Sequence, residues 1–280
     1  MRFVQVREGD RVVPGVIVDD SIVDLSAITA EIDGAFLGRD DLHEVVGTAI
    51  DSAPRLRLDG ADLAAPIARP IKILCIGLNF SDHAAESNLP IPAEPVLFIK
   101  DPSTIVGPFD DVLIPRNSVK TDWEVELGVV IGKRASYLAD PSESINHIAG
   151  FVVANDLSER TFQLEESGGQ WSKGKSAAGF NPTGPWLVTP DEVDYRNLRL
   201  RSWVNGEPRQ DSTTADLIFD VDFLIWHLSQ YLVLDPGDLV LTGTPEGVAL
   251  SGRFPYLKVG DVCEIEIEGL GRQRQEFIDA

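Results

Sequence analysis

Short apolar runs and alternating apolar and polar residues recur along most of the chain after residue 70. These patterns predict β-strands near residues 71–76, 96–100, 112–114, 123–131, 151–154, 186–188, 198–204, 239–242 and 262–267. Asn205-Gly206 after one of them predicts a hairpin turn. Apolar residues at helical spacing predict one helix over about residues 221–232. Many short strands joined by glycine and proline turns favour a mixed β-roll or β-sandwich, mainly β with some α, over a doubly wound sheet.

The first 65 residues have a weaker pattern. Strands are expected at residues 3–6, 12–18 and 22–25, and a helix with an acidic first turn near residues 40–50. Pro66 and Pro70 then disfavour both helix and central strand, so residues 64–70 are expected to form a linker. The sequence therefore predicts a small N-terminal α+β domain at residues 1–65 and a larger, mainly β domain at residues 70–280.

Two glutamates lie on one face of the strand predicted at residues 123–131. Side chains alternate between the two faces of a strand, so Val125 and Leu127 share one face while Glu124 and Glu126 share the other. Neighbouring carboxylates repel each other unless a cation lies between them. Carboxylate groups held this close together are usually ligands of a divalent cation. The alternative is a solvated strand face, with both glutamates in water.

A third carboxylate, Asp156, follows the apolar strand predicted at residues 151–154. Two Glu and one Asp, with no Cys or His nearby, suit Mg²⁺ or Mn²⁺, with Ca²⁺ as a further candidate, better than Zn²⁺. Three protein ligands would leave coordination positions for water and for a chelating substrate.

A histidine and a glutamate follow the strand predicted at residues 71–76. His83 and Glu86 are three residues apart, so they meet on one face if this segment is helical. A carboxylate bound to an imidazole fixes its tautomer, as a general base requires, whereas an isolated pair of this kind is more often a surface pair. Lys173 and Lys175 lie in a glycine-rich stretch, where they either hold an anionic substrate or are solvated.

The net charge and the cysteine content indicate which binding partners and which cellular compartment to expect. The chain has 45 acidic and 24 basic residues, and its net charge of −21 repels nucleic acid and anionic membranes. No apolar run has transmembrane length, and the N-terminus lacks the apolar segment of a signal peptide. Cys75 and Cys263 lie in apolar contexts and predict buried thiols. We therefore expect a cytoplasmic protein with no nucleic-acid or membrane partner.

In combination, these motifs resemble the fumarylacetoacetate hydrolase superfamily. The matching pieces, in chain order, are GLNFSDHAAES, PVLFIK, DWEVELGVVIGK, NDLSER with Gln163, KGKS and LTGTPEGV, which span about residues 70–272. They are most similar to the bacterial branch of 2-hydroxyhepta-2,4-diene-1,7-dioate isomerases and 2,4-diketo-3-deoxy-fuconate hydrolases. Leu78, Phe80, Ala178 and Gly179 depart from the residues that are common in the family at those positions.

The resemblance implies a fold, a metal and a set of roles. The fold would be a mixed β-roll catalytic domain with a smaller N-terminal domain, assembled as a homodimer. Glu124, Glu126 and Asp156 would hold Mg²⁺. His83 and Glu86 would activate water on a mobile segment, residues 80–92, and Lys175 would stabilise an enolate. The substrate would be contacted by Arg160, Gln163 and Thr244.

The expected reaction is metal-dependent hydrolysis of a carbon–carbon bond in a 2,4-diketo acid, an anionic small-molecule keto acid. The same site could instead support keto–enol isomerisation, or decarboxylation of an oxaloacetate-like acid, because each needs a stabilised enolate. A third hypothesis is a β-rich binding module with a structural Ca²⁺. Such a module would need the glutamates but not His83, Glu86 and Lys175 together.

Overall fold

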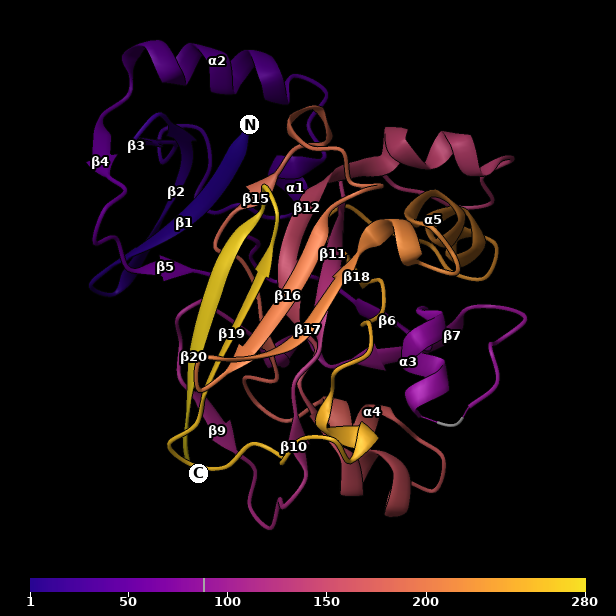
Figure 1. The fold of residues 1–280 in the computed structure, drawn as a ribbon. Coiled ribbons are helices and arrows are strands. Elements are labelled where there is room, and N and C mark those ends of the chain that lie inside the picture. Colours follow the sequence, from indigo (N-terminus) through magenta and orange to yellow (C-terminus); the bar gives the residue numbers. More distant parts are fainter. Residues whose placement is uncertain (88) are drawn as a thin grey trace.

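The computed structural model describes residues 1–87 and 89–280 as a mainly β protein built around two large sheets (Figure 1). In spatial order, the larger sheet contains β4 (Arg55–Arg57), β3 (Ser21–Asp24), β2 (Arg11–Val18), β1 (Arg2–Glu8), β15 (Leu187–Val188), β12 (Ile148–Asn155), β11 (Val125–Ile131), β18 (Leu239–Leu241), β6 (Ile73–Gly77) and β7 (Val96–Lys100), with β5 (Leu63–Ala64) paired to β1. The smaller sheet contains β17 (Glu207–Thr213), β16 (Arg199–Val204), β19 (Val262–Ile267), β20 (Gly271–Asp279) and β9 (Val112–Ile114).

The remaining elements are short. Two strand pairs stand apart from the large sheets, β10 (Thr121–Asp122) with β13 (Ser158–Glu159) and β8 (Ile105–Val106) with β14 (Asn181–Pro182). The α-helices are α1 (Gly34–Leu37), α2 (Leu42–Ser52), α3 (Ser81–Glu86), α4 (Ser172–Lys175) and α5 (Val221–Ser229). Short 3₁₀-helical segments are η1 (Pro102–Thr104), η2 (Pro141–His147), η4 (Pro190–Glu192), η5 (Thr214–Asp216) and η6 (Ala249–Ser251), and η3 (Thr161–Glu165) is a short π-helix. Among the described residues, every helix is too short or too polar to cross a bilayer.

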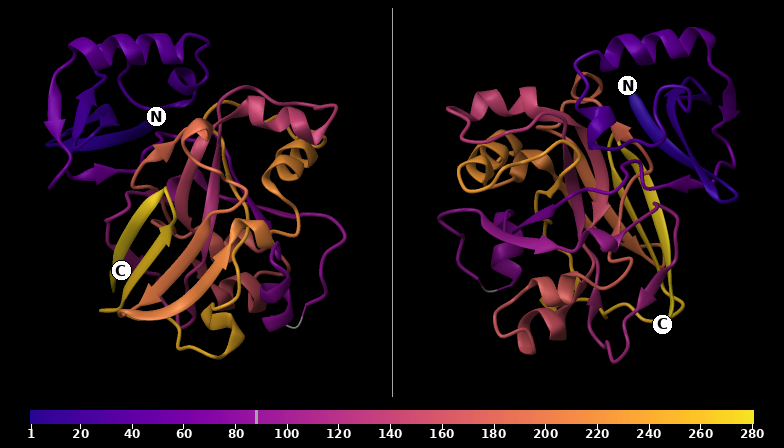
Figure 2. Two further views of the ribbon diagram at one scale, coloured as in Figure 1. Left: turned by 45° about the horizontal axis from the view of Figure 1, so that its top comes forward. Right: turned by 180° about the vertical axis from the view of Figure 1, so that it is seen from behind.

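The alternation predicted for the glutamate strand is confirmed by its packing. Trp123, Val125 and Leu127 are fully buried in the core between the two large sheets, which also receives the apolar face of α5. The opposite face of the larger sheet packs against α1 and α2, where Val130 is buried. Figure 2 shows these N-terminal elements at one end of the molecule and the smaller sheet across the central strands. Strand β11 is therefore buried on both faces, and its glutamates are inside the protein.

Strand β20 was not predicted, because its inward face is polar. Gln273 and Gln275 are fully buried there, and their amide groups donate to backbone carbonyl oxygens, including that of Val153 at 2.6 Å and that of Pro108 at 2.6 Å. Arg272, Arg274 and Glu276 on the outward face add to the polar appearance. Buried glutamines whose amide N–H groups donate to backbone carbonyls can replace apolar residues in a sheet, but the sequence pattern then looks like a solvated segment.

The expected linker at residues 64–70 is more ordered than its prolines suggested. Ala64 in β5 pairs with Gln5 in β1. Ile67 is buried in the core between the larger sheet and helices α1 and α2. Residues of β1 also pair with β15, so one continuous sheet runs from the N-terminal strands to those that carry the glutamates. The division into two domains at residues 65–70 stays a prediction.

Candidate active site

The register of β11 and β12 brings three carboxylates together. These strands are antiparallel, with Val125 opposite Asn155, and the backbone N–H of Asp156 donates to the carbonyl of Glu124 at 3.0 Å. Asp156 therefore lies directly across from Glu124, and Glu126 follows on the same face. Carboxylate oxygens of the three residues lie within 4.8 Å of one another, and all three side chains are buried.

Three buried cations surround this carboxylate trio. The ammonium of Lys175, at the end of α4, donates to Glu124 at 2.6 Å and to Asp156 at 2.7 Å. The ammonium of Lys100, at the end of β7, lies 2.5 Å from the other oxygen of Asp156. Arg160 donates to Glu124 at 2.7 Å and to Asp122 at 2.8 Å. Asp122 in turn accepts bonds from the backbone N–H groups of residues 249 and 250, which fixes the arginine.

Glu126 differs from the other two carboxylates, because no cationic side chain among the described residues bonds to it. Its hydrogen bond comes from the backbone N–H of Gly243, at 2.8 Å. Burial, and then the charges of Asp156 and Glu124, raise its pKa well above the ordinary value. For Glu124 burial acts in the same direction, but Lys175 and Arg160 outweigh it and hold its pKa well below the ordinary range. Gly243 has φ of 100°, and a Cβ there would lie 2.7 Å from Cβ of Asn79, so the turn requires glycine.

The charges and donor types of this trio fit a divalent cation. The four buried carboxylates, those of the trio and Asp122, face three buried cations, Lys100, Arg160 and Lys175, so the group carries one uncompensated negative charge when all four are ionised. The donors are oxygens only, as Mg²⁺, Mn²⁺ and Ca²⁺ prefer. A divalent cation would turn the local charge from −1 to +1. A divalent cation bound here would stabilise the ionised form of Glu126 and so lower its pKa.

The predicted pair on α3 is formed. His83 Nδ1 lies 3.0 Å from Glu86 Oε1, and both side chains are almost fully buried. Glu86 also accepts the backbone N–H of Gly247 at 3.1 Å and a bond from Arg253 at 2.9 Å. Burial alone would raise the pKa of Glu86, but the bonds from His83 and Gly247 lower it, so the carboxylate stays ionised. With Nδ1–H donating to this carboxylate, Nε2 is the nitrogen left to accept a proton.

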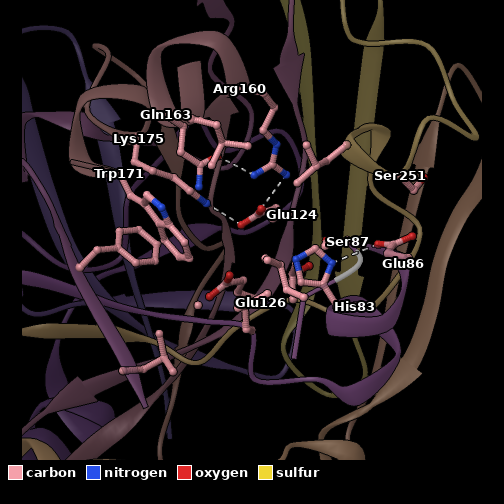
Figure 3. A pocket seen from close by; sticks show the side chains of 18 residues that line it. His83, Glu86, Ser87, Glu124, Glu126, Arg160, Gln163, Trp171, Lys175 and Ser251 are labelled. Carbon is pink, nitrogen blue, oxygen red and sulfur yellow. Dashed lines mark hydrogen bonds and ion pairs between the residues drawn. The ribbon is translucent and has the colours of Figure 1, made fainter. Parts of the chain in front are cut away.

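One pocket of about 310 Å³ joins the trio and the pair. In Figure 3, His83 and Trp171 lie on opposite sides of it, with Glu124 and Glu126 between them. Apart from Asp156, which is fully buried behind Lys175, the predicted site residues all line this pocket: His83, Glu86, Glu124, Glu126, Arg160, Gln163, Lys175 and Thr244. Residue 88, within the segment 80–92 predicted to be mobile, lies outside the described residues.

Some details of the site differ from the expectation. Of the two lysines that could hold an anionic substrate, Lys173 is exposed and does not line the pocket, because it lies on a different side of the short helix α4 from Lys175. Thr244 lines the pocket, yet its hydroxyl donates to the carbonyl of Val125 at 2.9 Å and accepts from Gln210 at 2.8 Å. It therefore supports β11 and offers no free donor to a ligand.

Lys100 and Arg253 were not predicted as site residues from the sequence. Lys100 ends an apolar strand, and a lone cation in that position was the available signal. Its partner could not be inferred, because three strands separate β7 from β12 in the sheet order. The sheet curls enough to bring Lys100 against Asp156. Arg253 lies in an irregular segment after η6 and gives no sequence signal.

Comparison with known proteins places this geometry in context. The family model described as "Fumarylacetoacetate (FAA) hydrolase C-terminal" matches residues 72–278. A 2,4-didehydro-3-deoxy-L-rhamnonate hydrolase from Sphingomonas sp. (strain SKA58) is 45% identical, over 99% of this chain and 95% of that protein. A mitochondrial oxaloacetate tautomerase from Bos taurus is 47% identical, over 74% of this chain and 66% of that protein.

A solved structure of similar shape carries a metal. Maleylpyruvate hydrolase from Sphingobium sp. SYK-6, in complex with manganese(II) ion and pyruvate, superposes with a TM-score of 0.83 at 28% identity, and the match covers 100% of both chains. The fold class expected from the sequence is confirmed by this likeness and by the strands described above. The resemblance on which the expectation rested is confirmed as well: this chain belongs to the fumarylacetoacetate hydrolase family of hydrolases and isomerases.

Proposed function

We propose that this protein hydrolyses a carbon–carbon bond in a 2,4-diketo acid, and that it requires a divalent cation, Mg²⁺ or Mn²⁺, held by Glu124, Glu126 and Asp156. The proposal rests on three kinds of group that meet at one pocket: two carboxylates of the trio, Glu124 and Glu126, with Asp156 directly behind them, the His83–Glu86 pair, and the buried ammonium of Lys175. The similarity to a rhamnonate-derived diketo acid hydrolase supports the same reaction class.

His83 acts as the general base. Its Nε2 takes a proton from a water molecule, and the water oxygen attacks the keto carbon farther from the carboxylate. Glu86 holds the imidazole by its Nδ1–H and stabilises the imidazolium that forms. The bond between that carbon and the neighbouring methylene carbon then breaks, and its electron pair remains on the methylene side as an enolate. His83 then donates the proton that it took from water to this carbon. The products are a keto acid and a carboxylic acid.

Lys175 stabilises the enolate by its charge. Burial alone would lower the pKa of Lys175, but Asp156 and Glu124 outweigh burial and raise it to about 12. The side chain is therefore protonated at neutral pH and serves as a cation and hydrogen-bond donor, not as a base. Arg160 is fixed by Asp122 and Glu124 and, with Gln163, shapes the polar end of the pocket.

A divalent cation bound at the trio would act as a Lewis acid toward the keto oxygen and the carboxylate of the substrate. The donor set supports this assignment, as does the manganese in the related maleylpyruvate hydrolase structure. A net charge of −21 would otherwise repel an anionic keto acid, so the locally positive pocket is needed to bind one. We also propose, from the family resemblance and the composition, that the protein acts as a cytoplasmic homodimer.

The second candidate function is enolate chemistry without hydrolysis of a carbon–carbon bond, and a separate observation supports it. The likeness to an oxaloacetate tautomerase favours keto–enol isomerisation at the same Lys175 and cation. In that reaction the pair His83–Glu86 would move a proton between carbon and oxygen and no water would attack. Decarboxylation of oxaloacetate would use the enolate in the same way.

Product analysis separates these reactions. The protein, loaded with Mg²⁺, is given acetylpyruvate in one assay and oxaloacetate in another, with a matched sample in excess chelator as the control. Pyruvate and acetate released from acetylpyruvate, and lost with the chelator, would support the hydrolase. Faster enol–keto conversion of oxaloacetate without acetylpyruvate cleavage would favour the tautomerase, and release of CO₂ from oxaloacetate would favour the decarboxylase.

We expect a modest loss of activity when Arg253 is replaced by methionine. Arg253 is half exposed and holds Glu86 from outside the pocket, so its removal loosens the orientation of His83 without touching the substrate. An exposed ion pair contributes at most about 1 kcal/mol, which corresponds to about a fivefold lower kcat with little change in KM. High salt should reduce the difference between wild type and variant, since it screens this pair. An equal kcat at low salt would contradict the role.

A further inference from the structure

The pocket has a polar half and an apolar half. The polar half contains Glu124, Glu126, the His83–Glu86 pair, Arg160, Gln163 and Lys175. The other half is apolar and reaches the pocket mouth, where Leu89 and Leu164 expose 45% and 47% of their surface. Its remaining large side chains are Ile76, Leu78, Phe98, Trp171 and Leu250. Exposed apolar side chains gathered at one cavity indicate contact with an apolar part of a ligand.

Within the apolar half, Leu78, Phe98 and Trp171 form a closely packed surface, here called the apolar wall. Trp171 packs over Gly77, where a Cβ would lie 2.5 Å from the indole ring, so a side chain at residue 77 would displace the tryptophan. The Trp171 and Phe98 rings meet edge to face with centroids 5.7 Å apart. Leu78 has φ of 55°, a left-handed conformation that is unfavourable for leucine. The structure thus holds a leucine in a strained turn at the edge of the pocket.

No cation that lines the pocket is free to pair with a second carboxylate of a substrate, among the residues that the structure describes. Arg160 is bonded to Asp122 and Glu124, and Lys175 to Glu124 and Asp156. Lys173 is exposed elsewhere, and Arg253 is tied to Glu86 and Glu246 outside this pocket. A carboxylate against the apolar wall would lose its hydration without a partner, which is costly.

We infer that the arm of the substrate beyond its second keto group is short, uncharged and largely apolar, so that the enzyme acts on monocarboxylic acylpyruvates and excludes dicarboxylic ones. This inference rests on the proposed function. The carboxylate and keto groups of the substrate occupy the polar half, and the arm lies against Leu78, Phe98 and Trp171. A pocket of about 310 Å³ is near the lower end for ligand sites, which limits the arm to a few carbon atoms.

Two substrates of equal chain length test the inference. Butanoylpyruvate ends in a methyl group and succinylpyruvate ends in a carboxylate, and hydrolysis releases pyruvate from both. With the Mg²⁺-loaded wild-type protein, kcat/KM should be at least about 100-fold higher for butanoylpyruvate, since an unpaired buried carboxylate costs several kcal/mol. Leu78→Arg should reduce this ratio at least about tenfold, by giving the second carboxylate a partner.

A matched control separates the local effect from the change in net charge. Val119→Arg adds the same charge at a residue that is 72% exposed and does not line this pocket, so its ratio should equal that of the wild type. Equal kcat/KM for both substrates in the wild type would overturn the inference and leave the proposed hydrolysis intact. A ratio that stays the same in Leu78→Arg would contradict the placing of the arm at this wall. Absence of pyruvate from both substrates would instead overturn the proposed function, and this inference with it.

Discussion

Replacing His83 with alanine is expected to lower kcat by about 10²- to 10⁴-fold and to change KM little, because a general base contributes to the transition state far more than to substrate binding. His83 has the position that this role needs, with Nδ1 bound to Glu86 at 3.0 Å and the ring lining the pocket. Steady-state kinetics on a confirmed substrate would measure the effect. Glu86→Ala should reduce kcat in the same direction, through loss of the imidazole orientation.

The control for this experiment is His43→Ala. His43 is exposed on α2, far in the chain from the pocket residues and not among those that line it, so its removal should leave kcat unchanged. Equal kcat for the wild type and His83→Ala would refute the role of general base. It would then favour a mechanism in which another group accepts the proton from water.

Replacing Glu126 with glutamine should weaken Mg²⁺ binding by more than about 100-fold, since even a residue that only supports a metal ligand typically contributes 10- to 100-fold. The fold should be retained. Glutamine has nearly the shape of a protonated glutamate, and the raised pKa of Glu126 indicates that a neutral side chain is tolerated there. The bond from the Gly243 N–H to an oxygen can also persist. Titration calorimetry would measure the binding, and circular dichroism would monitor the fold.

Glu276→Gln gives the matched comparison for that measurement. It removes one negative charge from an exposed position on β20, so it reports how much the overall charge alone changes Mg²⁺ affinity. The assignment of Glu126 as a ligand would have to be abandoned if both variants bound Mg²⁺ as tightly as the wild type.

The sequence was most informative where chemistry and strand alternation coincide. Glu124 and Glu126 could be placed on one face because side chains alternate along a strand, and the buried packing of Val125 and Leu127 confirms this. Asp156 could be added because it ends a neighbouring apolar strand. The register that places it opposite Glu124 could not be derived, since it depends on how two strands pair across some thirty residues of chain.

The rest of the site depends on long-range packing, which local patterns do not encode. Lys100 reaches Asp156 only because the larger sheet curls across three intervening strands. The two lysines of the glycine-rich stretch looked equivalent in the sequence, but one is buried and the other is exposed. Strand β20 was missed because hydrogen-bonded glutamines take the place of apolar residues on its inner face. The roles assigned to the pocket residues stay predictions.

The ammonium of Lys175, bound to both Glu124 and Asp156, serves as an internal counter-ion for the carboxylates. With Lys100 and Arg160 it neutralises most of their repulsion before any metal arrives. Folding and metal loading should therefore be separable steps, unlike in small zinc domains that are unfolded without their ion. A chelator would then act as a reversible off-switch for a protein that stays folded, and one preparation could be charged in turn with different divalent ions to compare their chemistry.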